Sequence, residues 1–128
     1  MVRISFITIL LFFFSIFFSR NILANEDRQF LFVPGFEDLP LMRDLEEGKF
    51  ETNFFDSPYG RIVESTVIVD VSAQDIRKFY NLTLPQLGWS QFEENYFLRE
   101  KEILNLHIEK IKESGLISVK FFLSPKDQ

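Results

Sequence analysis

One stretch of this chain places apolar residues at helical spacing after a helix-start signal, and short alternating segments flank it on both sides. Between residues 72 and 87 the apolar residues recur every three or four positions: Ile76, Phe79, Tyr80, Leu84 and Leu87. Ser72 stands before this stretch and Asp75 three positions later, a pair that satisfies free amide groups at a helix start. Pro85 has no backbone N–H to hydrogen-bond within a helix, and Gly88 favours the left-handed backbone conformation that often follows a helix end. The sequence therefore predicts one main helix over about 72–87 that kinks or ends near Pro85.

The flanking segments are predicted to be strands. Segments 51–55 and 61–71 are joined by Ser57-Pro58-Tyr59-Gly60, a turn sequence, and the second of them is rich in β-branched residues. After the helix, polar breaks separate four more segments: 89–92, 96–99, 103–111 and 116–123. The predicted order is β-β-α-β-β-β-β, which makes the fold class α+β, a two-layer sandwich of one helix on an antiparallel sheet.

The alternation within the strands predicts which faces are buried. Val63, Val67, Val69 and Val71 share one face with Arg61 and Ser65, and this is the expected core side. Leu104, Leu106 and Ile108 are expected to face the helix. Trp89, directly after Gly88, is expected to fold back into the core.

The first 24 residues have the pattern of a secretory signal. Arg3 precedes an apolar run from Ile4 to Phe18, and Ala24 supplies a small residue for cleavage. The run is shorter than the roughly 20 residues of a membrane-spanning helix. We expect a signal peptide at 1–24, cut after Ala24, and a periplasmic protein; the alternative is a retained anchor that holds the protein on the inner membrane through residues 4–18.

Removal of this segment leaves a distinctly acidic chain. Arg3 and Arg20 lie within it, so 12 Lys and Arg remain against 19 Asp and Glu, a net charge of −7. The basic residues are interspersed with Glu and form no cluster, which argues against nucleic-acid binding. Membrane contact is expected only through residues 1–24, if they are kept. The chain has no cysteine, so hydrophobic burial without disulfides must stabilise the fold.

Two parts are expected after the signal. Residues 25–50 form an irregular N-terminal arm, broken by Pro34-Gly35 and Pro40, and residues 51–128 form a single α+β domain. The arm is too apolar for a free linker, so part of it is expected to pack on the domain, with a helical turn around Leu41 to Glu46. The alternative is that the arm binds a partner.

Three segments of the chain carry a family resemblance: 55–64, Phe79-Tyr80, and Thr83-Leu84-Pro85-Gln86-Leu87-Gly88-Trp89. With them the chain resembles a group of small uncharacterised exported proteins of alphaproteobacteria, over about residues 34 to 123. The Phe-Tyr and Leu-Pro-x-Leu-Gly-Trp pattern is a structural one. The resemblance implies a bacterial envelope domain and assigns no catalytic residue.

No catalytic, metal-binding or cofactor motif is found in the sequence. His107 is the only histidine and is expected to face water, with no cysteine or second histidine to complete a transition-metal site. Ser57 and Ser65 lie in no nucleophile motif. The adjacent carboxylates Glu46-Glu47 and Glu93-Glu94 are expected to be solvated charges. We therefore expect no enzyme, no metal site and no cofactor.

Tyr59 and Arg61 are the candidate binding residues, because Tyr and Arg at an exposed turn are enriched at interaction hot spots. The alternative for Tyr59 is a turn residue that covers the core. The predicted function is a small protein-interaction module of the cell envelope whose partner is an unknown envelope protein. The alternative is a small-molecule or lipid carrier with an aromatic-lined pocket between helix and sheet. A filled core with an exposed apolar patch near the hairpin would favour the interaction module.

Overall fold

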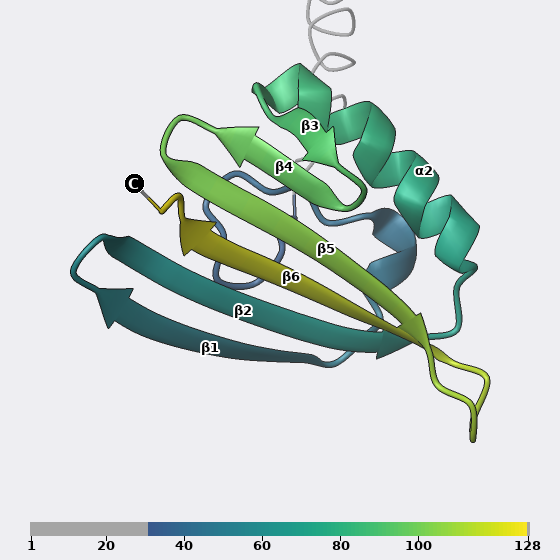
Figure 1. The fold of residues 1–128 in the computed structure, drawn as a ribbon. Helices are drawn as coiled ribbons and strands as arrows, with labels where there is room; N and C mark the ends of the chain where they lie inside the picture. The colour runs from purple at the N-terminus through teal and green to yellow at the C-terminus, as the bar shows by residue number, and fades with distance from the viewer. Residues whose placement is uncertain (1–30, 128) are drawn as a thin grey trace, which may run out of the picture.

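The computed structural model describes residues 31–127 (Figure 1). The elements, in chain order, are η1 (Arg43–Leu45), β1 (Phe50–Ser57), β2 (Gly60–Val69), α2 (Ala73–Thr83), η2 (Leu84–Leu87), β3 (Ser90–Glu93), β4 (Tyr96–Arg99), β5 (Glu102–Lys110) and β6 (Ile117–Pro125). The predicted order β-β-α-β-β-β-β and the α+β class are confirmed. The predicted signal peptide 1–24, its cleavage at Ala24 and the first residues of the arm lie outside the described residues.

The six strands form one antiparallel sheet in the order β1-β2-β6-β5-β4-β3. The last strand, β6, lies in the middle of the sheet, between β2 and β5 (Figure 1). Helix α2 and the N-terminal arm both lie against one face, which we call the helix-side face. The opposite face, the open face, carries no helix in the described part of the chain (Figure 1).

The helix begins and ends where its sequence indicates. The Ser72 side chain accepts a hydrogen bond from the backbone N–H of Asp75, at 3.5 Å. Pro85 does not kink an α-helix, because α2 ends at Thr83 and the chain continues as the 3-10 turn η2. Gly88 then ends this turn in a left-handed conformation, with φ of 88°. This conformation suits glycine and turns Trp89 back toward the core.

The core lies between the sheet and the layer of α2 and arm. Val63, Val67 and Val69 are buried as the alternation predicts, and so are Leu104 and Leu106. Ser65 is also buried on this face, and its hydroxyl lies 3.0 Å from that of Thr52, so the polar group is satisfied. The largest fully buried side chains are Tyr80, Phe97 and Phe121. Their burial provides the apolar area that a fold without disulfides requires.

The arm from residue 31 to 49 is part of this core. Its buried side chains are Val33, Phe36, Leu39, Met42 and Leu45. The backbone N–H of Val33 donates to the carbonyl of Leu39, at 2.9 Å. This hydrogen bond closes a loop on the helix-side face of the sheet. The helical turn predicted around Leu41 to Glu46 is η1.

Tyr80 connects the arm to the helix. Its hydroxyl donates to the carbonyl of Pro40, at 3.0 Å, and accepts from the backbone N–H of Met42, at 3.3 Å. Its ring meets Phe121 of β6 edge to face, with ring centres 5.2 Å apart. Burial raises the pKa of the Tyr80 phenol far above its ordinary value, although the hydrogen bond from Met42 lowers it. One side chain thus joins helix, arm and sheet.

Replacing Trp89 with Ala tests the packing at the end of η2. Trp89 is 5% exposed, and the guanidinium of Arg99 lies 4.3 Å from the centre of its ring. Loss of the ring leaves a cavity, so Trp89→Ala is expected to lower the free energy of unfolding by about 3–5 kcal/mol in chemical denaturation. A loss below about 1 kcal/mol would show that the ring contributes little to the core.

Replacing Tyr80 with Phe tests the connection between arm and helix. The change keeps the ring but leaves the carbonyl of Pro40 and the N–H of Met42 without the hydroxyl. The free energy of unfolding is expected to fall by about 1–3 kcal/mol in denaturation at pH 7.

The same variant gives a pH test with a defined sign. The pKa of Tyr80 is raised on folding, so its neutral form is favoured in the folded state and the phenol ionises first in the unfolded chain. The stability difference between wild type and Tyr80→Phe is therefore constant below about pH 10 and shrinks as the pH rises above it. A difference that grows above pH 10 would contradict a buried, neutral Tyr80.

Candidate functional site

The two edges of the sheet differ in length and protection. Edge strand β3 has four residues, a register shift between Gln91 and Glu93, and η2 beside it. Edge strand β1 has eight residues and pairs with β2 without any shift, from Phe50 opposite Val67 to Ser57 opposite Gly60. Short length, bulges, covering elements and charged side chains are among the means by which proteins block strand edges. Within residues 31–127 the β3 edge has the first three, whereas the β1 edge has only the charges of Glu51 and Asp56 and is unpaired.

The outward side of β1 is what we call the free edge. Within residues 31–127, β2 is the only strand that pairs with β1. In an antiparallel ladder, residues alternate between bonding the neighbouring strand and directing their backbone N–H and C=O groups away from it. About half of the β1 residues therefore present backbone donors and acceptors at the free edge.

Three large aromatic side chains surround the free edge. Phe54 is 67% exposed, Phe55 57% and Tyr59 79%. Phe54 lies opposite buried Val63 and so belongs to the helix-side face, whereas Phe55 lies opposite Ile62 on the open face. Both faces of β1 thus carry an exposed phenylalanine next to open backbone groups.

The arm passes close beneath β1 at Gly35. A Cβ at this position would lie 2.8 Å from Cγ2 of Thr52 and 2.9 Å from Cγ1 of Val63, and φ is 89°. Only glycine permits so close an approach with this backbone conformation. Residues 31–49 of the arm therefore support the helix-side face of β1 and do not pair with its outer edge.

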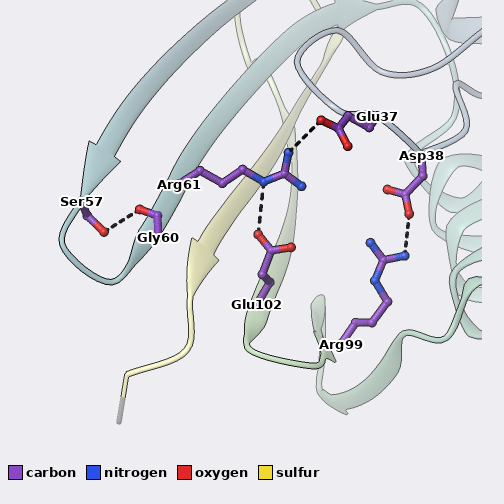
Figure 2. A network of polar contacts seen from close by, with 7 residues as sticks. All are labelled: Glu37, Asp38, Ser57, Gly60, Arg61, Arg99 and Glu102. Carbon is purple, nitrogen blue, oxygen red and sulfur yellow. Dashed lines mark hydrogen bonds and ion pairs between the residues drawn. The ribbon is translucent and has the colours of Figure 1, made fainter.

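Tyr59, a predicted binding residue, lies at the tip of the β1–β2 hairpin. Ser57 shapes the turn: its hydroxyl donates to the carbonyl of Gly60, at 2.7 Å, and accepts from the N–H of Tyr59, at 3.3 Å (Figure 2). The Tyr59 side chain is the most exposed of the large apolar side chains described, so it does not cover the core.

Arg61, the other predicted binding residue, is engaged within the protein. Its Nε lies 3.3 Å from a carboxylate oxygen of Glu102, and its Nη1 lies 3.9 Å from one of Glu37 (Figure 2). In the same view Arg99 binds Asp38 of the arm, at 2.7 Å. These ion pairs join the arm to β2 and β4, and β2 to β5. Arg61 thus contacts two carboxylates within the protein, whereas Tyr59 is exposed at the hairpin tip.

The open face of the sheet holds a groove of about 760 Å³. Its apolar part comes from Phe92, Tyr96, Ile103 and Phe122, and its polar part includes Glu64, Asn105, His107 and Lys120. Phe92 and Tyr96 lie with ring centres 6.0 Å apart, and Lys120 pairs with Glu64 at 3.7 Å. His107 faces water as predicted, with a side chain that is 60% exposed.

This groove corrects the position predicted for a carrier pocket. The expected place, between helix and sheet, is filled by Ile76, Tyr80 and Leu84 of the helical layer against Leu106 and Phe121 of the sheet, all 0–2% exposed. The space between helix and sheet holds no such pocket among the residues described, because Tyr80, Phe97 and Phe121 fill the core there, whereas Phe92, Tyr96 and Phe122 lie on the open face. The hollow is on the other side of the sheet.

Two kinds of feature are not found within residues 31–127. No group of three or more His, Asp or Glu side chains in this range is placed to hold a metal ion. None of the helices described is both long and apolar enough to cross a membrane.

The sequence analysis missed the aromatic residues of the free edge. Segment 51–55 was predicted only as a strand, whereas its Phe54 and Phe55 side chains are both exposed. A signal was present, since adjacent residues in a strand point to opposite faces, so at most one of two neighbouring phenylalanines can face a single core.

Comparisons with family models, with curated proteins and with solved structures find no match to this chain. The free edge and the groove are therefore the features from which a function is argued.

Proposed function

We propose that this protein is a non-enzymatic, exported cell-envelope protein that binds another envelope protein through the free edge of β1. The observation that carries the proposal is the exposure of Phe54, Phe55 and Tyr59 around an eight-residue strand edge that the fold leaves unpaired. An exposed strand edge flanked by exposed aromatic side chains is a template for pairing with another chain.

The chemistry of the edge fits a polypeptide partner better than a small molecule. An added strand gains backbone hydrogen bonds along β1 and covers apolar side chains on both faces. Full burial of Phe54 and Phe55 would contribute about 1.5–3 kcal/mol each, before the cost of association. Tyr59 at the hairpin tip extends the same surface beyond the strand.

Export is supported by the sequence pattern of residues 1–24, which combines a basic start, an apolar run and Ala24. The proposed location is the periplasm, with anchoring on the inner membrane through residues 4–18 as the alternative. The acidic balance of the chain after Ala24 keeps an exported domain soluble.

A small-molecule or lipid carrier is the second candidate, and the groove on the open face is the observation that favours it. Its volume of about 760 Å³ lies within the range of ligand sites, and it combines aromatic with polar side chains. The groove is an open surface and not an enclosed cavity, so it buries less of a ligand than carrier pockets do.

Site-specific crosslinking in living cells tests the proposed function. A photo-reactive phenylalanine analogue is placed at Phe55 or, as a matched control, at Phe92, which is exposed to nearly the same extent, 55% against 57%. After fractionation, we expect a defined protein adduct in the periplasmic or membrane fraction for position 55 and a much weaker one for position 92.

Three results would contradict the proposal. The first is recovery of the protein only in the cytoplasm, and the second is equal labelling at both positions. The third is a bound lipid or metabolite in native mass spectra of the protein, together with crosslinks at Phe92 alone, which would favour the carrier.

A further inference from the structure

The net charge of the described chain lies entirely in the part that builds the free edge. Residues 31–70, which form the arm, β1 and β2, contain three Lys or Arg against nine Asp or Glu. Residues 71–127 contain eight of each and are neutral overall. A net charge of −6 on one part of a small domain attracts positively charged partners and repels negatively charged ones.

Much of this charge gathers where β1 begins. A hollow of about 710 Å³ lies between the turn before β1 and the loop after β2, and its carboxylates belong to Asp44, Glu46, Glu47, Asp70 and Asp75. Arg43 is the one basic residue of its lining. We call this the acidic hollow. Because Phe50 of β1 pairs with Val67 of β2, residues 44–47 and 70–75 meet at the same end of the hairpin.

Strand direction connects the hollow to the free edge. Every ladder of the sheet is antiparallel, and antiparallel pairing is slightly the more stable kind. An antiparallel strand added to β1 starts opposite Ser57 and ends opposite Phe50. Its C-terminal end then lies at the end of the hairpin where the acidic hollow is found.

We propose that the free edge takes up an extended segment of a partner protein as a seventh, antiparallel strand, and that a Lys- or Arg-rich stretch follows directly after this segment. The apolar middle of the segment lies along Phe54 and Phe55, one on each face of the sheet, and the basic stretch lies in the acidic hollow. This inference rests on the proposed function and names the chemistry of its partner.

The charge distribution disfavours a second copy of this chain at the same edge. Pairing β1 with β1 would bring together two regions that each carry a net charge of −6, and neither copy would supply cations for the other's hollow. A basic segment removes this repulsion and adds attraction.

Binding of synthetic peptides to the purified protein tests the inference. The protein is purified in the form that accumulates in cells. The probe is a fluorescent peptide of alternating Thr and Val with a Val-Val centre, followed by Lys-Lys-Arg. One control peptide carries Glu-Glu-Glu instead of the basic stretch, and another is methylated on alternate backbone nitrogens so that it cannot donate to β1. Each control is expected to bind at least about tenfold more weakly than the probe, measured by fluorescence anisotropy at low salt.

Matched variants locate the binding site. The double variant Glu46→Gln, Glu47→Gln removes two carboxylates of the hollow, and Glu94→Gln, Glu113→Gln removes two exposed ones outside its lining. The first is expected to weaken probe binding about tenfold and the second less than about twofold. Phe54→Ala is expected to weaken it several-fold and Phe92→Ala not at all. All these side chains are exposed, so the variants are expected to fold, and thermal unfolding checks this.

The outcomes separate this inference from the proposed function. Equal binding of the Lys and Glu peptides, or undiminished binding of the methylated peptide, would overturn the basic added strand. So would a homodimer that Phe54→Ala dissociates, since a second copy would then occupy the edge. If no peptide binds but the crosslink at Phe55 still forms, the interaction module stands and the partner chemistry is wrong. If both are absent, both proposals fall.

Discussion

The rest of the structure depends on the packing of the arm against the sheet, and the hydroxyl of Tyr80 joins the packed arm to helix α2. Helix α2 is short and lies toward the β5 side of the sheet, so it cannot cover the helix-side face alone (Figure 1). The arm covers the remainder with Phe36, which meets Phe121 of β6 edge to face, ring centres 6.4 Å apart. The bonds from Tyr80 to Pro40 and Met42 fix the arm in this position. A chain without cysteine thereby obtains a closed core from 19 buried apolar side chains of arm, helix and sheet.

The same arrangement explains why one sheet edge remains open. The arm contacts the helix-side face of β1 at Gly35. Its carboxylates Glu37 and Asp38 form ion pairs with Arg61 and Arg99, respectively. These contacts hold it under the sheet and away from the edge. β1 carries Glu51 and Asp56, but it pairs with β2 without a bulge, and Phe54 and Phe55 are exposed on its two faces. Edge, aromatic residues and acidic hollow together form a surface suited to an extended, basic segment.

Local patterns in the sequence predicted the elements well, because each strand and the helix follow their own periodicity. The strand predicted at 96–99 is β4 with the same ends, and Ser72, Pro85 and Gly88 marked the limits of the helical segment. Alternation also identified the buried side of β2. The order of strands in the sheet is set by long-range pairing of β6 with β2 and β5, which no local pattern contains. For that reason the sequence could not show that β1 is an edge strand or that both Phe54 and Phe55 are exposed, although their adjacency indicated that at least one lies outside the core. It pointed to Tyr59, which lies on that surface, and to Arg61, which is engaged with the arm.

Amide hydrogen exchange along β1, with and without the basic probe peptide, tests the central claim most directly. If the β1 edge is open and takes up a strand, alternate amides between Phe50 and Ser57 exchange fast in the free protein and become protected when the peptide binds. Alternate amides of β1 that are already protected in the free protein, or protection that appears only around Phe92, Tyr96 and Phe122 in the groove, would contradict it.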